Sequence, residues 1–327
     1  MYIVTGGAGF IGSAMIWKLN SLGIDNILAV DNLASSEKWK NLVNRRFAEY
    51  MHRDAFIDMV ARDTLEAALG GSITAIIHMG ACSSTTERDA DFLMRNNLAY
   101  SKALCLYALK KKARFINASS AATYGDGSNG FDDDPARLAL LKPLNMYGFS
   151  KHLFDLWAQK NGILDEVASL KFFNVYGPNE EHKGDMRSVV HKAFQQIRAG
   201  GTMRLFRSVT PDYPDGGQMR DFIYVKDCVD VMCWLLEHPM ANGVFNVGTG
   251  TARSWNDLAG AVFTAMDLPV NIEYIDMPGD LAGKYQNFTE ARMERLEAAG
   301  YDQPMHSLEQ GVADYVRCYL QAPDHYL

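Results

Sequence analysis

A tyrosine and a lysine four residues apart, Tyr147 and Lys151, could carry out proton transfer. At this spacing on a helix the two side chains share a face. A nearby ammonium favours the phenolate and lowers the pKa of the tyrosine from about 10, so Tyr147 could act as a general base. The spacing is common by chance, but Ser120, at the end of an expected strand, could hydrogen-bond a substrate oxygen opposite the phenol. We therefore predict a catalytic triad of Ser120, Tyr147 and Lys151.

A glycine-rich turn near the start of the sequence predicts a dinucleotide site. A β-branched run over 2–5 leads into TGGAGFIG, and apolar residues then recur at helical spacing until Gly23. In a strand–turn–helix unit, glycines admit a pyrophosphate, and the helix N-terminus offers N–H groups to it. A second apolar run, 27–30, ends at Asp31, about 20 residues past the turn, where an acidic residue usually contacts the adenosine ribose. The alternative is an ordinary strand-to-helix connection.

Composition is that of an ordinary soluble enzyme. The chain has 327 residues, 48% hydrophobic and 22% charged, so it can build one large core or two modest ones. Its net charge of −7 gives no basic field for nucleic acid, and Lys110–Lys112 reads as the solvated end of a helix. No apolar run is long enough to span a membrane, and Met1 leads straight into a strand without a signal peptide. We therefore expect a cytoplasmic protein with no nucleic-acid or membrane partner.

The cysteines and histidines predict no metal site and no disulfide framework. The five cysteines are odd in number and lack metal-ligand spacing, and the eight histidines form no cluster. We therefore expect reduced thiols packed in the core.

Strand-like and helical runs alternate through the first half of the chain. Apolar runs at 75–78 and 114–117 flank a helical segment over about 101–112, and further strand-like runs cover 169–175 and 244–247. Alternation of this kind predicts an α/β protein with a Rossmann-type, doubly wound parallel sheet covered on both faces. Ligands should then bind at the carboxyl ends of the strands.

The alternation breaks at two places, which predicts a smaller mixed α/β domain for the substrate. Loops rich in glycine, proline and charge fill 174–220, and mixed helices follow Gly250. We expect a cofactor-binding domain formed by residues 1–173 plus about 220–250. The substrate-binding domain would comprise about 174–219 plus 251–327.

The chain resembles the extended branch of the short-chain dehydrogenase/reductases, and within it the epimerases of ADP-heptoses. The resemblance covers nearly the whole chain. Besides the glycine turn and the triad, it is carried by Val30–Leu33, Gly80–Glu87, Phe173–Pro178, His182–Gly184, Arg220–Phe222, Lys284–Thr289, Ala299–Tyr301 and Gly311–Tyr315.

That resemblance implies an epimerase that inverts C6 of ADP-glycero-manno-heptose in the synthesis of the lipopolysaccharide inner core. Tightly bound NADP would oxidise C6 and then return the hydride to the other face. Because the two epimers present their hydroxyl protons on different sides, two bases are expected, Tyr147 for one epimer and Lys183 for the other. Taken alone, Lys183 reads as a surface lysine. The resemblance also implies a homo-oligomer, a pentamer.

The resemblance assigns further residues to the site, and none to a metal. The expected catalytic residues are Tyr147, Lys183, Lys151 and Ser120. The expected cofactor-binding residues are Gly6, Gly9, Phe10, Ile11, Gly12, Asp31, Asn32, Lys38, Arg53, Met79, Ser83, Asn96, Lys151, Val175 and Lys183. The expected substrate-binding residues are Ser83, Ser120, Asn174, Asp185, Phe206, Arg220 and Tyr285.

Two of these assignments have alternatives. Asp31 by itself favours NAD, because a carboxylate repels a 2′-phosphate, whereas Asn32, Lys38 and Arg53 could neutralise that phosphate. The resemblance implies NADP, with NAD as the alternative. Arg220 suits a diphosphate because its donors fit phosphate oxygens, but it could instead pair with a carboxylate such as the one next to it in sequence.

The chain departs from the pattern near the substrate. Met79 replaces a glutamate found in some members, Asp185 replaces a serine, and the loop 208–218 is longer. The loop could cover the site or meet a neighbouring subunit. These departures leave the identity of the sugar more open than the fold.

Three other functions are compatible with parts of the pattern. A UDP-hexose 4-epimerase would share the sheet and the triad. A nucleotide-sugar 4,6-dehydratase would need a strand-end acid where Ala121 and Ala122 stand. A cofactor-sensing or scaffold protein would keep the fold without catalysis, although the retained triad argues against it.

Overall fold

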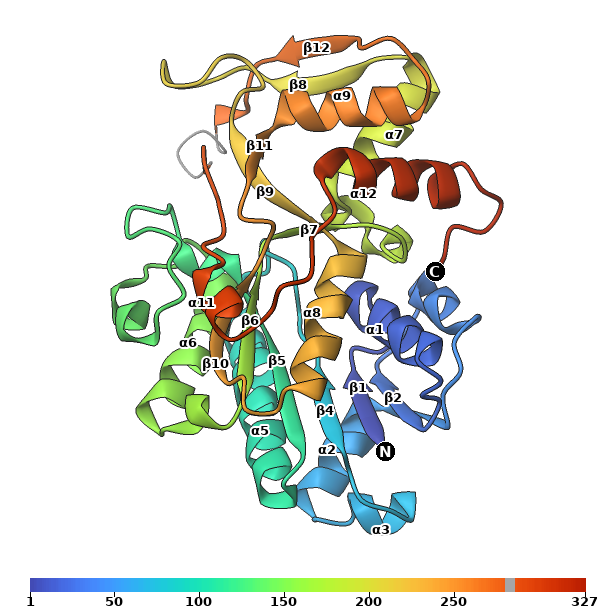
Figure 1. Cartoon of the computed structure of the whole chain (residues 1–327), viewed down its shortest axis with the longest axis vertical. Helices are drawn as coiled ribbons and strands as arrows, with labels where there is room; N and C mark the ends of the chain where they lie inside the picture. The colour runs from blue at the N-terminus through green and yellow to red at the C-terminus, as the bar shows by residue number, and fades with distance from the viewer. Residues whose placement is uncertain (280–285) are drawn as a thin grey trace.

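A seven-stranded parallel sheet forms the centre of the chain, whose computed structural model describes residues 1–279 and 286–327 (Figure 1). The strand order is β10-β6-β5-β4-β1-β2-β3. The strands are β1 (Tyr2–Thr5), β2 (Ile27–Asp31), β3 (Glu49–His52), β4 (Ala75–His78), β5 (Arg114–Ser120), β6 (Ala168–Phe172) and β10 (Gly243–Val247). The predicted Rossmann-type α/β fold is confirmed.

Helices cover both faces of this sheet, which is why the strands β1, β2 and β4 are largely apolar. The crossover from β1 to β2 and those from β4 to β6 run across the sheet in opposite directions, so right-handed connections place their helices on opposite faces. Helices α1 (Phe10–Ser21) and α8 (Val225–Glu237) pack together on one face. On the other lie α2 (Arg53–Ala61), α5 (Tyr100–Lys111) and α6 (Met146–Lys160), with α2 packed on α5.

The chain reverses its direction of travel across the sheet between β1 and β4. It runs from β1 outward to β3 on one side and from β4 outward to β10 on the other. At this point the backbones of Gly6 and Gly80 nearly touch, since a Cβ atom on Gly6 would lie 2.7 Å from the nitrogen of Gly80. In open α/β sheets a crevice for ligands forms at such a reversal.

A second part of the molecule rises above the carboxyl ends of these strands (Figure 1). It contains a three-stranded sheet in the order β11-β9-β7 and a parallel pair of β12 and β8. Its elements are β7 (Asn174–Tyr176), α7 (Val189–Gly200), β8 (Met203–Phe206), β9 (Met219–Tyr224), β11 (Ala252–Ser254), α9 (Trp255–Ala265), β12 (Ile272–Ile275) and α12 (Leu308–Tyr315).

The single strand predicted over 169–175 is in fact two strands of different sheets. β6 pairs with β5 and β10, whereas β7 pairs with β9. The backbone N–H of Val175 donates to the carbonyl of Phe173 at 3.0 Å, which bends the chain at Asn174. One strand-like stretch of sequence therefore crosses from the seven-stranded sheet to the upper one.

Shorter elements complete the described chain. They are the helices α3 (Leu65–Leu69), α4 (Ala90–Leu93) and α11 (Glu294–Ala298), the 3-10 turns Glu37–Leu42, Ala121–Tyr124, Pro135–Leu140, Ile163–Asp165 and Glu181–Met186, and the π-helical turns Met94–Ala99 and Val316–Leu320. Within residues 1–279 and 286–327, none of the helices has the length and apolar character needed to cross a membrane.

Candidate active site

A cavity of about 720 Å³ opens at the carboxyl ends of β1, β2, β4 and β5. The segment that follows β6 closes it from above. All of the residues expected to bind the cofactor line this cavity, namely Gly6, Gly9, Phe10, Ile11, Gly12, Asp31, Asn32, Lys38, Arg53, Met79, Ser83, Asn96, Lys151, Val175 and Lys183. Ser120, Tyr147 and Asn174 line it as well.

The glycine turn fits a dinucleotide pyrophosphate. A side chain at Gly12 would collide with the carbonyl oxygen of Gly6, so only glycine allows α1 to begin here. Gly9 is the N-cap of α1, makes no side-chain cap, and no acidic residue occupies the first turn. The N–H groups and positive end of α1 thus face the cavity without a competing carboxylate.

The carboxylate of Asp31 is held by the glycine turn and by a lysine. It accepts hydrogen bonds from the backbone N–H of Ala8 at 2.9 Å and of Asn32 at 2.7 Å. Lys38 Nζ lies 2.6 Å from Asp31 Oδ1. Asp31 therefore fastens the turn to the end of β2, and Lys38 balances its charge.

Close packing of α6 brings Tyr147 next to Ser120. The side chain of Asn145 caps the helix by accepting from the N–H of Gly148 at 2.8 Å. A Cβ atom at Gly148 would lie 2.6 Å from the carbonyl oxygen of Ala122, so only glycine permits this approach. The helix start thus lies directly on the 3-10 turn that follows β5.

The predicted lowering of the pKa of Tyr147 is wrong for this structure. Burial raises the pKa of the phenol, and a hydrogen bond with Ser120 opposes that rise without cancelling it. The amine of Lys151 instead donates to the carbonyl of Ala118 at 2.6 Å. Burial lowers the pKa of Lys151 to about 8. Desolvation therefore outweighs the helical spacing from which the shift was inferred.

A fully buried ion pair lies behind the triad and joins α6 to the sheet. Asp155, one turn beyond Lys151 on α6, lies 2.8 Å from Lys171 of β6. Asp155 also accepts from the hydroxyl of Ser119 at 2.7 Å, and Lys171 donates to Thr123 at 2.7 Å. The pair thus connects both elements that carry Ser120 and Tyr147.

We expect Lys171→Met to lower the free energy of unfolding by about 3–5 kcal/mol, because it leaves the Asp155 carboxylate buried without a counter-charge. Urea unfolding followed by circular dichroism measures the change. The double variant Lys171→Met/Asp155→Leu should recover most of the loss, since it removes both charges. A single-variant loss below about 1 kcal/mol would contradict the argument.

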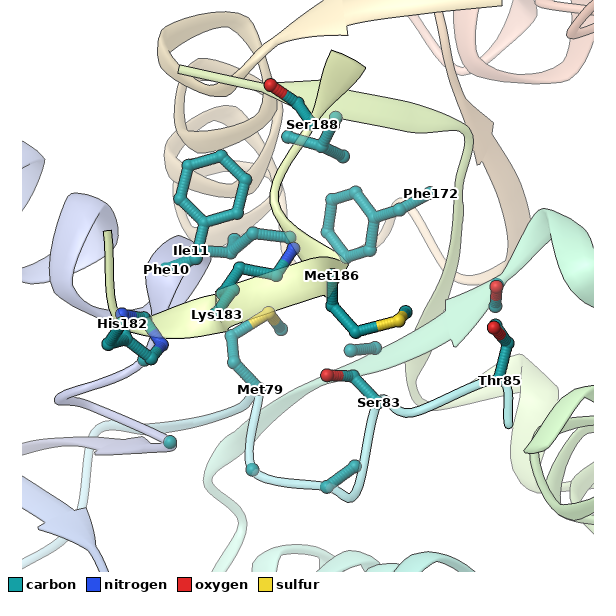
Figure 2. Close-up of a pocket in the computed structure, with 18 of the residues that line it drawn as sticks. Phe10, Ile11, Met79, Ser83, Thr85, Phe172, His182, Lys183, Met186 and Ser188 are labelled. Atoms are coloured by element: carbon teal, nitrogen blue, oxygen red, sulfur yellow. The ribbon is translucent and has the colours of Figure 1, made fainter. Parts of the chain in front are cut away.

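Lys183 extends from the 3-10 turn Glu181–Met186 into the cavity (Figure 2). Its Nζ lies 5.0 Å from the ring centroid of Phe10. Burial lowers the pKa of Lys183, which raises the fraction of neutral amine near neutral pH. A neutral amine in a substrate-sized cavity can accept a proton, so the lysine that reads as a surface residue in the sequence can act as a base.

Three further expected substrate contacts, Asp185, Phe206 and Arg220, are not among the residues that line the cavity. Asp185 is exposed, and Phe206 ends β8. Arg220 is only 6% exposed, and its guanidinium lies 5.6 Å from the ring centroid of Trp255. Tyr285 lies outside the described residues.

Asp221, the alternative partner considered for Arg220, is held by the backbone of other segments. Its carboxylate accepts from the N–H groups of Thr249 at 2.7 Å, Gly250 at 3.0 Å and Ala291 at 3.0 Å. Strand alternation directs Asp221 and its neighbour Arg220 to opposite faces of β9.

Several cavity residues escaped the sequence analysis. Met186 lines the same cavity as Lys183 and Ser83 (Figure 2), and Ser188 also lines it, although its hydroxyl donates to the Glu180 carboxylate at 2.6 Å. His182 also lines the cavity, and burial lowers its pKa to about 4, so it is neutral at physiological pH. Their closeness to Lys183 in the sequence was the signal available.

Comparisons with known proteins agree with this geometry. The model of the "NAD dependent epimerase/dehydratase family" matches residues 2–248. A relative from Nitratidesulfovibrio vulgaris strain DP4, named ADP-L-glycero-D-manno-heptose-6-epimerase, is 67% identical over all of both chains. One of the same name from Fusobacterium nucleatum is 48% identical, again over all of both.

Solved structures of similar shape include relatives of the same class. The crystal structure of Helicobacter pylori ADP-L-glycero-D-manno-heptose-6-epimerase superposes with a TM-score of 0.78 at 27% identity, covering 96% of this chain and 94% of that one. Thermus thermophilus UDP-glucose 4-epimerase, solved with NAD, gives 0.72 at 23% identity and shows the shared fold, covering 95% and 96%. This chain is therefore an epimerase that works with a nicotinamide dinucleotide, and it belongs to the NAD dependent epimerase/dehydratase family.

Proposed function

We propose that the protein interconverts ADP-D-glycero-D-manno-heptose and ADP-L-glycero-D-manno-heptose at C6, in the synthesis of the lipopolysaccharide inner-core precursor. The identity of 67% over the full length to a relative of that name supports the substrate. The structural observation that carries the proposal is that Tyr147 and Lys183, from separate elements, line one cavity with the glycine turn. A two-base epimerisation needs such an arrangement.

Each residue has a defined task in this reaction. When bound, the dinucleotide supplies the hydride acceptor and donor for C6. Tyr147 removes the C6 hydroxyl proton from one epimer, and Lys183 removes it from the other. Ser120 hydrogen-bonds Tyr147 and, when the substrate is bound, would instead donate its single hydroxyl proton to the C6 oxygen. The lowered pKa of Lys183 favours the neutral amine that this role requires.

We infer that the upper part of the chain, about 174–219 plus 251–327, holds the ADP-heptose, while the seven-stranded sheet holds the dinucleotide. From the resemblance to the epimerases of ADP-heptoses we also propose that the protein is cytoplasmic and acts as a homo-oligomer, a pentamer.

We propose NADP as the cofactor, because Lys38 both offsets the charge of Asp31 and lines the cavity. Lys38→Ala should weaken NADP⁺ binding about 10- to 100-fold and NAD⁺ binding far less. The variant loses a charge-assisted hydrogen bond, worth about 1.5–3 kcal/mol, and leaves a carboxylate facing the 2′-phosphate. Calorimetric titration of both dinucleotides measures the change.

Lys40→Ala is the matched control, since Lys40 pairs with Glu37 on the surface and does not line the cavity. It should bind both dinucleotides like the unchanged protein. An equal loss of NAD⁺ and NADP⁺ in Lys38→Ala would rule out recognition of the 2′-phosphate by Lys38.

The test of the function is incubation of the purified protein with ADP-D-glycero-D-manno-heptose and no added cofactor. NMR should show a mixture of the two C6 epimers, without accumulation of reduced nicotinamide. UDP-galactose is the control substrate and should remain unchanged. Absence of heptose conversion by a protein that releases a dinucleotide on denaturation would refute the heptose assignment and retain the fold and triad.

A further inference from the structure

Buried polar atoms without partners gather at one place beside the cavity. Gln218, the residue before β9, is 1% exposed, and neither atom of its carboxamide has a hydrogen-bond partner in the described structure. The same holds for Trp255 Nε1, Asn287 Oδ1 and Thr289 Oγ1. These four residues hold five of the ten such atoms in residues 1–279 and 286–327, although they come from three separate stretches of chain.

The four side chains share one face of the β9 sheet. The backbone N–H of Trp255 donates to the backbone carbonyl of Gln218 at 3.2 Å, which places these two residues opposite each other. On the other edge, the backbone N–H of Met219 donates to the backbone carbonyl of Asn287 at 2.8 Å, and the backbone N–H of Thr289 donates to the carbonyl of Met219 at 3.2 Å. These two bonds have the pattern of parallel strands, with Met219 bonded to the residues on either side of its partner. Asn287 and Thr289 therefore point to the same side of the sheet as Gln218.

The cavity extends to this face of the β9 sheet. Side chains alternate along a strand, so Gln218 lies on the same side of β9 as Phe222. The rings of Phe222 and Trp255 lie 5.1 Å apart, and both residues line the cavity. Trp255 therefore belongs both to the cluster of unpaired polar atoms and to an aromatic wall of the substrate cavity.

Unpaired buried groups are rare in native proteins and cost about 1–3 kcal/mol each, so a cluster of them indicates a ligand that supplies the partners. A carboxamide offers one donor and one acceptor side by side. Adenine offers the complementary pair, a 6-amino group beside a ring nitrogen, and glutamine pairs with it through two hydrogen bonds. Aromatic side chains provide the flat surface on which a base packs.

We propose that Gln218, Trp255, Asn287 and Thr289 form the subsite that recognises the nucleobase of the sugar nucleotide, with the Gln218 carboxamide paired to adenine. The inference rests on the proposed function, which supplies ADP as the nucleotide. Asp31, which ends β2 of the seven-stranded sheet, and its partner Lys38 mark the proposed adenosine end of the dinucleotide site, so the two adenines have separate positions.

The test is Gln218→Met, which keeps the length of the side chain and removes its donor and acceptor. Calorimetry on protein saturated with NADP⁺ compares ADP with purine riboside diphosphate, which lacks the 6-amino group. The unchanged protein should prefer ADP at least about 10-fold, and the variant should bind the two alike, as expected for loss of a bidentate base contact. Retention of NADP⁺ should be unchanged.

Thermal unfolding without ADP separates this role from a structural one. Because Gln218 makes no side-chain hydrogen bond in the described fold, Gln218→Met should melt at the same temperature or higher. Thr289→Val should fold equally well and should also weaken ADP binding. The control Gln321→Met, at an exposed position, should change nothing.

Unchanged selectivity for ADP in Gln218→Met would overturn the inference, and so would a lower melting temperature with equal loss of both nucleotides. The proposed function is judged separately, by turnover of ADP-heptose in the unchanged protein. Selective ADP binding that depends on Gln218, without heptose turnover, would reject the sugar and keep the subsite. Turnover of ADP-heptose by the unchanged protein, combined with unchanged selectivity for ADP in Gln218→Met, would keep the heptose assignment and reject the subsite.

Discussion

Tyr147→Phe should lower kcat for epimerisation about 10²- to 10⁴-fold, the usual contribution of a positioned general acid–base group. The substitution keeps the ring that packs at the start of α6. It removes only the hydroxyl that hydrogen-bonds Ser120 and would carry the substrate proton. Binding of the dinucleotide and of ADP should be unchanged, so the loss should appear in kcat and not in KM.

Single-turnover kinetics with each epimer shows whether Tyr147 serves one of them only. In Tyr147→Phe, oxidation should stop for the epimer that uses Tyr147 and continue for the epimer that uses Lys183. Absorbance of reduced nicotinamide reports each half-reaction. Tyr274→Phe is the control, because Tyr274 donates to Asn256 at 3.0 Å in the upper part and does not line the cavity. Equal loss with both epimers would exclude a two-base division.

Lys183→Ala should produce a loss of similar size, about 10²- to 10⁴-fold in kcat, with the opposite epimer affected in the half-reaction. Lys183→Arg should not restore activity, because a guanidinium stays protonated and cannot accept the proton, although it can still pack over Phe10. The control Lys160→Ala removes an exposed lysine at the end of α6 and should leave kcat unchanged.

The lowered pKa of Lys183 also predicts the direction in which the rate of this half-reaction changes with pH. Burial lowers the pKa of Lys183, so the half-reaction that uses its neutral amine should rise with pH until that pKa is passed and then level off. Lys183→Ala should abolish this rise and leave the profile of the other epimer intact. A Lys183→Ala protein with undiminished turnover would remove Lys183 from the mechanism.

The sequence predicted six of the seven strands of the central sheet and missed the edge strand β3, and the residues expected by resemblance to bind the cofactor all line the cavity. Runs such as 27–30 and 75–78 are apolar throughout because both faces of their strands are buried, and this signal is local. The glycine turn also carries its reason locally, since Gly12 is required by contact with Gly6 a few residues earlier. Local causes of this kind can be inferred without coordinates.

Other features depend on contacts between distant segments and could not be predicted. Spacing on α6 suggested that Lys151 acidifies Tyr147, but burial by the surrounding chain decides the direction of the pKa shift. The cluster around Gln218 is assembled by strand pairing with residues 255, 287 and 289. No spacing rule relates such positions, so a buried carboxamide without a partner becomes visible only in the folded chain.

At the bend at Asn174 the chain passes from the central sheet to the upper one. This layout limits how the upper part can be exchanged between proteins during evolution. The upper part is built from stretches on both sides of α8 and β10, so no single cut in the gene would release it as a module. Recombination of whole domains therefore cannot supply a new sugar specificity to this architecture. New substrates would then arise by substitution and by changes in loop length within the upper part.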